Sequence, residues 1–358
     1  MNIDELRREI DKIDKRIVEL LARRSSIAKV IGEIKRREGL PVIDLIREWE
    51  VLSNVRLESL KLGLNPDTVL SIYRRIIDLC RASQNAPKVA FLGPRGSFSE
   101  EAARRFFPLE ESIEFKEYPS IRDVFRAVEE GEVDYGVVPI ENSIEGGVNE
   151  TLDLLFETKL KICGELEHRI RLNLIGKPGI KIEDVKILVS HPQAINQCRN
   201  FIERALKGVE IREATSTSRA VKMALESEYM AAIGSELAAR LYGGEIIAKG
   251  IEDYRDNYTR FFLLGWEDSP RMDGCKTSII FSTHHKPGAL YKALSVFAER
   301  GINLTKIESR PIKGRPWEYM FYVDFEGHRD DDACKEAIED LRGRALFVKI
   351  LGSYRKVT

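Results

Sequence analysis

The N-terminal 36 residues carry apolar side chains at helical spacing for about ten turns without a break. A helix of this length spans about 50 Å, because each residue adds about 1.5 Å along the axis. One compact monomeric domain cannot enclose such a rod. We therefore expect the helix to pack along an extended partner, most simply a second copy of itself. The apolar positions are Ile3, Leu6, Ile10, Ile13, Ile17, Leu20, Leu21, Ile27, Val30, Ile31 and Ile34.

The rest of the N-terminal segment predicts two more helices. Gly39 and Pro41 end the first helix, and helical spacing resumes at residues 44–62 and again at 66–84. The turn Gly63-Leu64-Asn65-Pro66 separates these two stretches. Residues 1–86 should therefore form an all-α domain.

The pattern changes at Pro87. Short β runs alternate with helical runs over residues 87–267, which predicts an α/β domain with largely parallel pairing and with ligands held by loops that open helices. A composition break at 267–274 precedes a strand–helix–strand–strand–helix–strand order over residues 274–358. That order is typical of a ferredoxin-like α+β module.

Composition excludes several classes of function. Lys and Arg total 57 and Asp and Glu total 58, so the net charge of −1 argues against nucleic acid or an anionic membrane as a partner. The five cysteines form no CxxC or Cys/His cluster, which argues against a metal site and against disulfides. The N-terminus is charged from its fourth residue, and no apolar run reaches the length of a membrane span. We expect a soluble cytoplasmic protein.

Cations on the first helix lie off its apolar stripe. Arg24 and Lys35 are eleven residues apart, which returns them to within about 20° of each other and about 16 Å apart along the axis. Two long side chains can close that gap over a small anion. Arg7 lies about 100° from Arg24, so it reaches a partner's site more easily than its own. Taken singly, such cations are more often solvated surface charges.

The wider pattern resembles the all-helical class of chorismate mutases over the whole segment. The matching stretches are Leu6-Arg7, Leu20 to Arg24, Gly32 to Lys35, Pro41 to Asp44, Arg47-Glu48 and Gln84. The resemblance implies an intertwined dimer that rearranges chorismate to prephenate. That pericyclic reaction needs a fixed conformer and stabilised charge on the breaking C–O bond, with no metal or cofactor.

The resemblance also implies roles for these residues. The substrate's two carboxylates would be held by Arg24, by Arg47 and by Arg7 of the other chain. Glu48, with Asp44 nearby, would bind the hydroxyl, and Lys35 and Gln84 would hydrogen-bond the ether oxygen. Cys80 stands where a small polar residue such as Ser is common in that class.

Four patches of the α/β segment together resemble prephenate dehydratases over residues 88–266. They are Gly93 to Ser99, Pro139 to Ser143, Ser190 to Gln193 with Gln197, and Thr259-Arg260-Phe261. Singly, the glycine loop and the serine are ordinary helix starts. The resemblance implies two α/β lobes like those of type II periplasmic binding proteins, the second covering residues 172–248, with the substrate in the cleft.

The implied reaction removes a carboxylate as CO2 and a hydroxyl as water, leaving aromatic phenylpyruvate, and needs no cofactor. By resemblance, Thr259 acts at the leaving hydroxyl, and Glu141, Asn142, Ser190 and Gln197 position the substrate. Three further residues surround them, namely Ser97, Arg260 and Phe261. A protonated Glu141 is the alternative proton donor.

Two motifs of the last segment resemble the ACT domains of prephenate dehydratases, which bind L-phenylalanine at a dimer interface. They comprise Gly288, Ala289 and Leu290, and then Asn303, Glu308, Ser309, Arg310 and Pro311. A helix N-terminus with free backbone groups suits the carboxylate of an amino acid. Feedback inhibition by phenylalanine follows as an expectation, and it requires two states of the cleft.

Two alternatives stay open at the level of sequence. An arogenate or cyclohexadienyl dehydratase would carry the same motifs, and a non-catalytic sensor of aromatic ligands would use the same cleft. The intact Thr259-Arg260-Phe261 tripeptide argues against the sensor. Because the helical and C-terminal modules each tend to dimerise, the homodimer can pair further into a tetramer.

Overall fold

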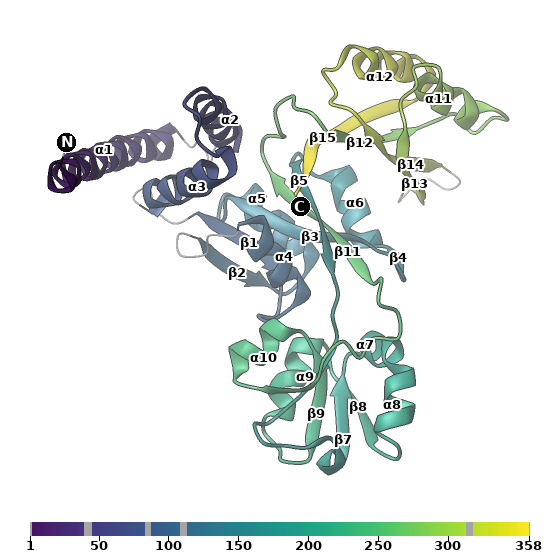
Figure 1. Ribbon diagram of the computed structural model, residues 1–358. Helices are drawn as coiled ribbons and strands as arrows, with labels where there is room; N and C mark the ends of the chain where they lie inside the picture. The colour runs from purple at the N-terminus through teal and green to yellow at the C-terminus, as the bar shows by residue number, and fades with distance from the viewer. Residues whose placement is uncertain (1, 39–44, 83–86, 108–112, 313–317, 358) are drawn as a thin grey trace. The chain divides into compact units, whose positions relative to one another are not determined.

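The computed structural model describes residues 2–38, 45–82, 87–107, 113–312 and 318–357 (Figure 1). The chain divides into two compact units: the first contains the N-terminal helices, and the second runs from Ala90 to the C-terminus except for residues 107–114. Among the described residues, none of the helices combines the length and apolar character that crossing a membrane requires.

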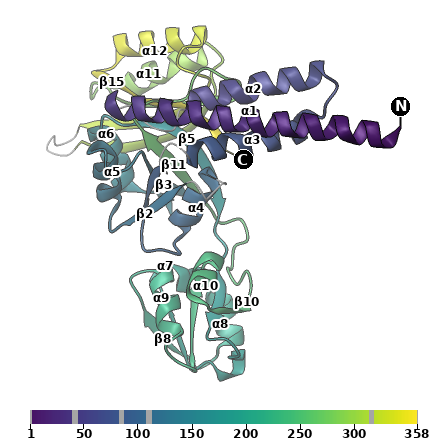
Figure 2. The same cartoon turned by 90° about the vertical axis from the view of Figure 1, so that its left-hand side faces the viewer.

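The N-terminal unit confirms the three expected helices. They are α1 (Ile3–Glu38), α2 (Leu45–Lys61) and α3 (Pro66–Ala82). The Asn65 side chain accepts hydrogen bonds from the backbone N–H groups of Asp67 and Thr68, which fixes the start of α3. In Figure 2, α1 is one uninterrupted rod.

The apolar stripe of α1 is not covered by its own chain. Ten of its predicted positions keep between 38% and 66% of their surface exposed. The exposed positions are Ile3, Leu6, Ile10, Ile13, Ile17, Leu20, Ile27, Val30, Ile31 and Ile34. Large apolar patches of this kind mark association surfaces.

The second unit contains two α/β lobes. The first lobe is built on β1 (Lys88–Leu92), β2 (Glu114–Tyr118), β3 (Tyr135–Asn142), β4 (Gly146–Gly147), β5 (Lys161–Arg169) and β11 (Tyr258–Gly265). Its helices are α4 (Phe98–Phe106), α5 (Ile121–Glu129) and α6 (Asn149–Glu157). Within the sheet the strands run in the order β5-β11-β3-β1-β2.

The second lobe has its own five-stranded sheet, in the order β10-β6-β9-β7-β8. Its strands are β6 (Asn173–Gly176), β7 (Ile187–Ser190), β8 (Glu210–Glu213), β9 (Met230–Gly234) and β10 (Glu245–Ala248). Its helices are α7 (Pro192–Gln197), α8 (Arg199–Ala205), α9 (Thr217–Ala224) and α10 (Glu236–Tyr242). The two-lobed α/β architecture that the sequence predicts is therefore confirmed.

The prediction of largely parallel pairing is wrong for the strands that join the lobes. β7 pairs in parallel with β8 and β9, but β11 is antiparallel to both β3 and β5. The chain leaves the first lobe after β5 and returns along β11 (Figure 1). Since the two crossings run in opposite directions, neighbouring strands there must be antiparallel.

The C-terminal domain confirms the expected βαββαβ order. It contains β12 (Cys275–Ser282), α11 (Ala289–Ala298), β13 (Leu304–Pro311), β14 (Tyr319–Glu326), α12 (Asp332–Arg344) and β15 (Phe347–Val357). One face of its sheet packs on α11 and α12, and the other face joins the core of the first lobe through Ile280, Tyr322 and Tyr354. Both faces of this sheet are therefore buried.

The C-terminal domain and the first lobe share one continuous sheet. β15 pairs in parallel with β5 at Lys356 and Val357, which links the strand order β13-β14-β12-β15 to that of the first lobe. The Lys349 ammonium on β15 also donates hydrogen bonds to the carbonyl oxygens of Leu155, Phe156 and Thr158 at the end of α6. Backbone and side chains thus fasten the two parts together.

Gly352 is required where β15 crosses β5. A Cβ atom at this position would lie against the carbonyl oxygen of Ile162 and 2.9 Å from its backbone nitrogen. We predict that Gly352→Ala lowers the free energy of unfolding by about 1–3 kcal/mol, because two backbones must separate. Urea titration measures the loss. Gly343→Ala is the control, since a Cβ there meets nothing within 4 Å; an equal loss in the control would contradict the explanation.

Candidate active sites

In the helical unit, Arg24 of α1 meets α3. Its Nη1 donates to the carbonyl oxygen of Ile76, at 3.4 Å, and to the sulfur of Cys80. Cys80 is buried, so the residue that departs from the chorismate mutase pattern lies directly beside the predicted substrate-binding cation. Lys35 and Glu48 are half-buried, and Arg47 pairs with Glu50 at 2.7 Å. Asp44 and Gln84 lie outside the described residues.

Arg7 does not join this group within one chain. Its side chain is 74% exposed and lies 3.8 Å from Asp4. Seventeen residues of continuous helix separate it from Arg24, which is about 25 Å along the axis. The cations that the sequence assigns to one substrate therefore do not converge inside a single copy.

In the α/β unit, a chain of polar side chains surrounds Thr259. The Nδ2 of Asn142 on β3 donates to Thr259 Oγ1 at 2.9 Å and to Asn257 Oδ1 at 2.8 Å. Asn257 donates in turn to Gln197 Oε1 of the second lobe, at 3.0 Å. The structure thus brings together the predicted residues Asn142 and Thr259 and links Gln197 of the other lobe to them through Asn257.

The orientation of the Asn142 amide is fixed by its own loop. Its Oδ1 accepts hydrogen bonds from the backbone N–H groups of Ile144 and Glu145, both at 3.0 Å. Its amide hydrogens must therefore point to Thr259 and Asn257. Because Thr259 Oγ1 accepts from Asn142, the hydroxyl proton of Thr259 remains available for donation to a bound molecule.

Aromatic rings close the other side of Thr259. Phe261 is buried and shares a face of β11 with Thr259, since side chains alternate along a strand. His168 lies opposite Thr259 on β5, with its ring 6.4 Å from those of Phe98 and Phe261 between centroids. The Nε2 of His168 lies 2.8 Å from Glu101.

Arg260 does not face this site, contrary to the prediction that it binds substrate. It points to the opposite face of β11 from Thr259, over the ring of Phe262. There its guanidinium pairs with Glu141 at 2.9 Å, with Glu165 at 2.5 Å and with Asp324 of the C-terminal domain at 2.8 Å. Arg260 therefore links the first lobe to the C-terminal domain.

These ion pairs also decide the charge of Glu141. Burial by itself raises the pKa of this carboxyl, but Lys306 and Arg260 outweigh it and hold the pKa below its ordinary value. Burial likewise raises the pKa of Glu165, and the charges of Arg260 and Lys276 lower it below its ordinary value. An ionised Glu141 does not suit the alternative role of proton donor.

The two predicted serines have structural partners. Ser97 donates to the carbonyl oxygen of Leu92 at 2.9 Å and accepts from the N–H of Glu100 at the start of α4. Ser190 is wholly buried, and its hydroxyl donates to the carbonyl oxygen of Ile233 at 2.8 Å. The expectation that Ser190 touches substrate is therefore not supported, because this hydroxyl joins β7 to β9.

A hollow of about 710 Å³ opens between the lobes at the carboxyl ends of β1, β2 and β8. Ligands of open α/β sheets bind at such ends. Its polar lining includes the cations Arg219 and Lys222 of α9 and the hydroxyl groups of Thr215 and Ser216. None of the residues that the sequence assigns to the dehydratase site lines this hollow.

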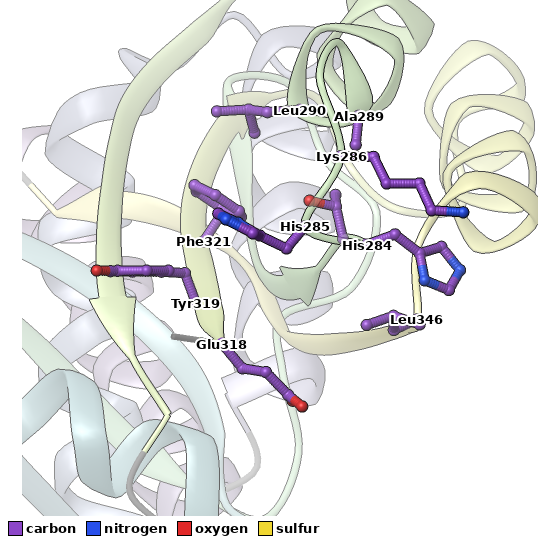
Figure 3. Close-up of a pocket in the computed structure, with 10 residues that line it drawn as sticks. His284, His285, Lys286, Ala289, Leu290, Glu318, Tyr319, Phe321 and Leu346 are labelled. Carbon is purple, nitrogen blue, oxygen red and sulfur yellow. The ribbon is translucent and has the colours of Figure 1, made fainter. Parts of the chain in front are cut away.

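A second hollow, of about 310 Å³, lies at the start of α11 in the C-terminal domain (Figure 3). The side chains around it come from the loop before α11, the first turn of α11, β14 and the segment before β15. They are Thr283, His284, His285, Lys286, Ala289, Leu290, Glu318, Tyr319, Phe321 and Leu346. A cation, an anion and aromatic rings thus share one small site.

Only part of the predicted amino-acid site lines this hollow. Ala289 and Leu290 do, and Gly288 precedes them as the N-cap of α11. Arg310 of β13 instead pairs with Asp153 of the first lobe at 3.1 Å. Glu308 pairs with Lys306 of its own strand at 3.0 Å and lies close to Gly147 of the first lobe. Asn303, Ser309 and Pro311 are not among the residues around the hollow. Within one chain the two predicted motifs therefore lie apart.

Sequence families match each part of the chain. Residues 6–85 match chorismate mutase type II, residues 89–269 match prephenate dehydratase, and residues 277–343 match the ACT domain. The Aquifex aeolicus protein named bifunctional chorismate mutase/prephenate dehydratase is 44% identical over 357 residues, covering 99% of this chain and 98% of the relative.

Two further relatives cover the α/β and C-terminal parts. Arabidopsis thaliana arogenate dehydratase/prephenate dehydratase 2, chloroplastic, is 41% identical over 283 residues, 75% of this chain and 72% of the relative. The crystal structure of prephenate dehydratase in complex with L-Phe from Arthrobacter aurescens has a TM-score of 0.69 and 33% identity, covering 75% of this chain and 90% of that one.

The buried ion pairs make a prediction about stability. Glu165→Gln should lower the free energy of unfolding by about 3–5 kcal/mol at neutral pH, because it breaks a buried pair and leaves Arg260 and Lys276 undercompensated. Folding lowers the pKa of Glu165, so its contribution is present above the ordinary carboxyl pKa and is lost as pH falls through the folded-state pKa.

Wild type should therefore lose more stability than Glu165→Gln between about pH 5 and pH 3, as measured by urea unfolding. Glu203→Gln removes an exposed partner of Arg199 and should cost at most about 1 kcal/mol. If the free energy of unfolding fell equally with pH in wild type and in Glu165→Gln, the ion pairs of Glu165 would not stabilise the fold.

Proposed function

The chain belongs to the family of bifunctional chorismate mutase/prephenate dehydratases with a C-terminal ACT domain, and on that basis we propose where each activity resides. It is an enzyme with chorismate mutase and prephenate dehydratase activities, consistent with a place in L-phenylalanine biosynthesis. The observation that carries the assignment of the dehydratase site is the Asn142–Thr259 hydrogen bond.

For the mutase, we propose an intertwined homodimer formed along α1. The uncovered stripe of α1 supplies the apolar surface that a second copy would bury. Arg7 is about 25 Å from Arg24 within one chain, so an antiparallel partner would bring its own Arg7 to Arg24 and Lys35. Each active site is then completed by both chains, with Arg47, Glu48, Asp44 and Gln84 in the roles that the family pattern gives them.

The cage proposed for chorismate needs no proton transfer. Cations bind the two carboxylates and hold the folded conformer, which removes the entropy cost of reaching it. Lys35 and Gln84 donate hydrogen bonds to the ether oxygen, where negative charge develops as the C–O bond breaks. The C–C bond forms in the same step, so no atom is gained or lost.

Mixing two inactive variants tests the shared site. Arg7→Ala and Lys35→Ala should each lose nearly all mutase activity when pure. After unfolding and refolding together in equal amounts, about a quarter of the sites should be intact, because half of the dimers contain both variants and each of these has one unaltered site. Chorismate consumption measures the recovery, because the dehydratase of both variants would consume the prephenate that forms. No recovery from folded mixed dimers would place both residues in a site of one chain.

For the dehydratase, we propose that Thr259 donates its hydroxyl proton in a hydrogen bond to the departing oxygen of prephenate. Asn142 occupies the acceptor side of Thr259 Oγ1, which leaves that proton free. The bond between the ring and the carboxylate breaks and releases CO2, and its electron pair aromatises the ring as the C–O bond breaks. The departing hydroxide becomes water with the proton of Thr259, which solvent replaces after the products leave. Phe261 and the buried surroundings keep bulk water away.

We further propose that Asn257 belongs to this site. It joins Asn142 to Gln197 and so ties the reacting strand to the second lobe. Arg260 pairs with three carboxylates of the chain, so we do not assign it to the carboxylates of the substrate.

Thr259→Ala should lower the dehydratase kcat by about 10²–10³-fold, since one donor to the developing charge is lost. Asn257→Ala should lower the dehydratase kcat by a smaller factor, and it removes the hydrogen bond to Gln197. Both variants should convert chorismate to prephenate at the wild-type rate. The absorbance of phenylpyruvate in alkali, without any acid treatment, measures the second step, because acid alone would convert prephenate to phenylpyruvate. Loss of both activities from a folded Thr259→Ala protein would contradict two separate sites.

For regulation, we propose that the hollow at the start of α11 binds L-phenylalanine and that binding inhibits the dehydratase. The Arthrobacter aurescens prephenate dehydratase was solved in complex with L-Phe, and this chain shares its ACT domain. Lys286 and the helix N-terminus suit the carboxylate, Glu318 suits the ammonium, and Leu290 with Phe321 suits the ring. A second copy would bring further residues if C-terminal domains pair, which allows a tetramer.

Arogenate is the alternative substrate of the second step. The Arabidopsis thaliana relative is named for both arogenate and prephenate. The two substrates differ by an amino group in place of a ketone, and we assign prephenate because the chain carries its own mutase domain to supply it. The ratio of kcat/KM for the two purified substrates decides between them.

A further inference from the structure

Three ion pairs cross from the C-terminal domain to the first lobe and end on neighbouring strands. Asp324 pairs with Arg260 on β11 at 2.8 Å, Lys276 with Glu165 on β5 at 2.9 Å, and Lys306 with Glu141 on β3 at 2.8 Å. Asp324 and Glu165 are fully buried. Buried charges are costly unless they are paired, so these pairs hold the two domains in one alignment.

The Lys306 pair differs from the other two because it starts on β13. Side chains of β13 alternate between half-buried and exposed, and Lys306, Glu308 and Arg310 share the half-buried face. Glu308 comes so close to β4 that a Cβ added to Gly147 would lie 2.6 Å from its carboxylate oxygens. One face of this edge strand is thus fitted to the end of β3 and to β4.

Only Glu141 and Asn142 stand between Lys306 and the hydroxyl of Thr259. Its ammonium, 8% exposed, holds the carboxylate of Glu141. The next residue of β3 is Asn142, whose amide donates to Thr259 Oγ1 at 2.9 Å. A displacement of the Glu141 end of β3 therefore changes the hydrogen bond that orients the Thr259 hydroxyl.

β13 is also coupled to the proposed amino-acid pocket. Phe321 and Tyr319 of β14 line that pocket, and their ladder partners on β13 are Ser309 and Pro311. A ligand that shifts this part of β14 shifts β13 with it, because the strands share backbone hydrogen bonds. The path from the pocket to Thr259 thus runs through β14, β13, Lys306, Glu141 and Asn142.

We propose that Lys306 is a positioning residue of the dehydratase. We also propose that it transmits amino-acid binding in the C-terminal domain to the dehydratase site. In the active state its ammonium holds Glu141 so that Asn142 orients Thr259, and occupation of the pocket moves β13 and withdraws that support. This inference rests on the proposed function, since it names how inhibition reaches the dehydratase site. The mutase site has no part in it.

Lys306→Met in the full-length chain tests the proposal, because methionine keeps the stem and removes the charge. Its dehydratase kcat should fall severalfold, and the phenylalanine concentration for half inhibition should rise by about tenfold or more. Equilibrium dialysis with labelled phenylalanine, without substrate, should show binding within about threefold of wild type. Lys306→Arg should restore both kcat and inhibition. If Lys306→Met does not fold, Lys306→Gln provides the same comparison.

Asp153→Asn is the matched control, since it breaks another ion pair between the domains but acts on α6 through Arg310. It should leave inhibition within about twofold of wild type. Inhibition of Lys306→Met equal to wild type would overturn the proposal, and so would equal losses in both variants. Wild-type protein without dehydratase turnover would instead refute the proposed function, so the two failures can be told apart.

Discussion

The interaction on which the second unit depends is the burial of Arg260 among Glu141, Glu165 and Asp324. Burial by itself lowers the pKa of Arg260, but the neighbouring carboxylates raise it above its ordinary value, so this guanidinium stays charged. Its partner carboxylates come from β3, β5 and β14. They stay ionised in the protein interior because the cation of Arg260 lies next to them. Removal of Arg260 would leave the buried carboxylate of Asp324 without its cation, and an uncompensated buried charge is strongly destabilising.

Because side chains alternate along β11, three consecutive residues perform two tasks. Thr259 and Phe261 face the site where the substrate is proposed to react, while Arg260 faces the C-terminal domain. The strand that carries Thr259 is therefore also the strand that the C-terminal domain holds through Arg260. An enzyme built this way can be controlled without a long path between sites, since the backbone of one strand connects them. In the helical unit, the exposed apolar stripe of α1 is the observation that supports the proposed dimer.

Much of this structure follows from local sequence patterns. The three helices, the two lobes and the βαββαβ module are predictable because periodicity, glycine turns and caps act over a few residues. The relative direction of β5 and β11 was not predictable from local patterns, because their antiparallel pairing depends on how the chain crosses between the lobes. The role of Arg260 was misjudged for the same reason, since its partners lie 64 to 119 positions away in sequence.

The candidate site shows the same division. Asn142, Gln197 and Thr259 are found from short motifs, and the structure brings them together. Asn257 was missed, although it lies two residues before Thr259 and so on the same face of the chain. Glu308 and Arg310 were assigned to the amino-acid site by their motif, yet Arg310 pairs with Asp153 of the first lobe and Glu308 pairs with Lys306 of its own strand. A motif marks which residues matter, while only tertiary contacts show which side of a strand each one serves.

The measurement that tests the account most directly follows chorismate, prephenate and phenylpyruvate together in one reaction of the full-length protein, with and without L-phenylalanine. The account predicts that chorismate is converted to phenylpyruvate and that phenylalanine stops the second step, so that prephenate accumulates. Phenylpyruvate formation that continues unchanged with the C-terminal pocket saturated by phenylalanine would contradict the account, because the sensor would then have no hold on the strand that carries Thr259.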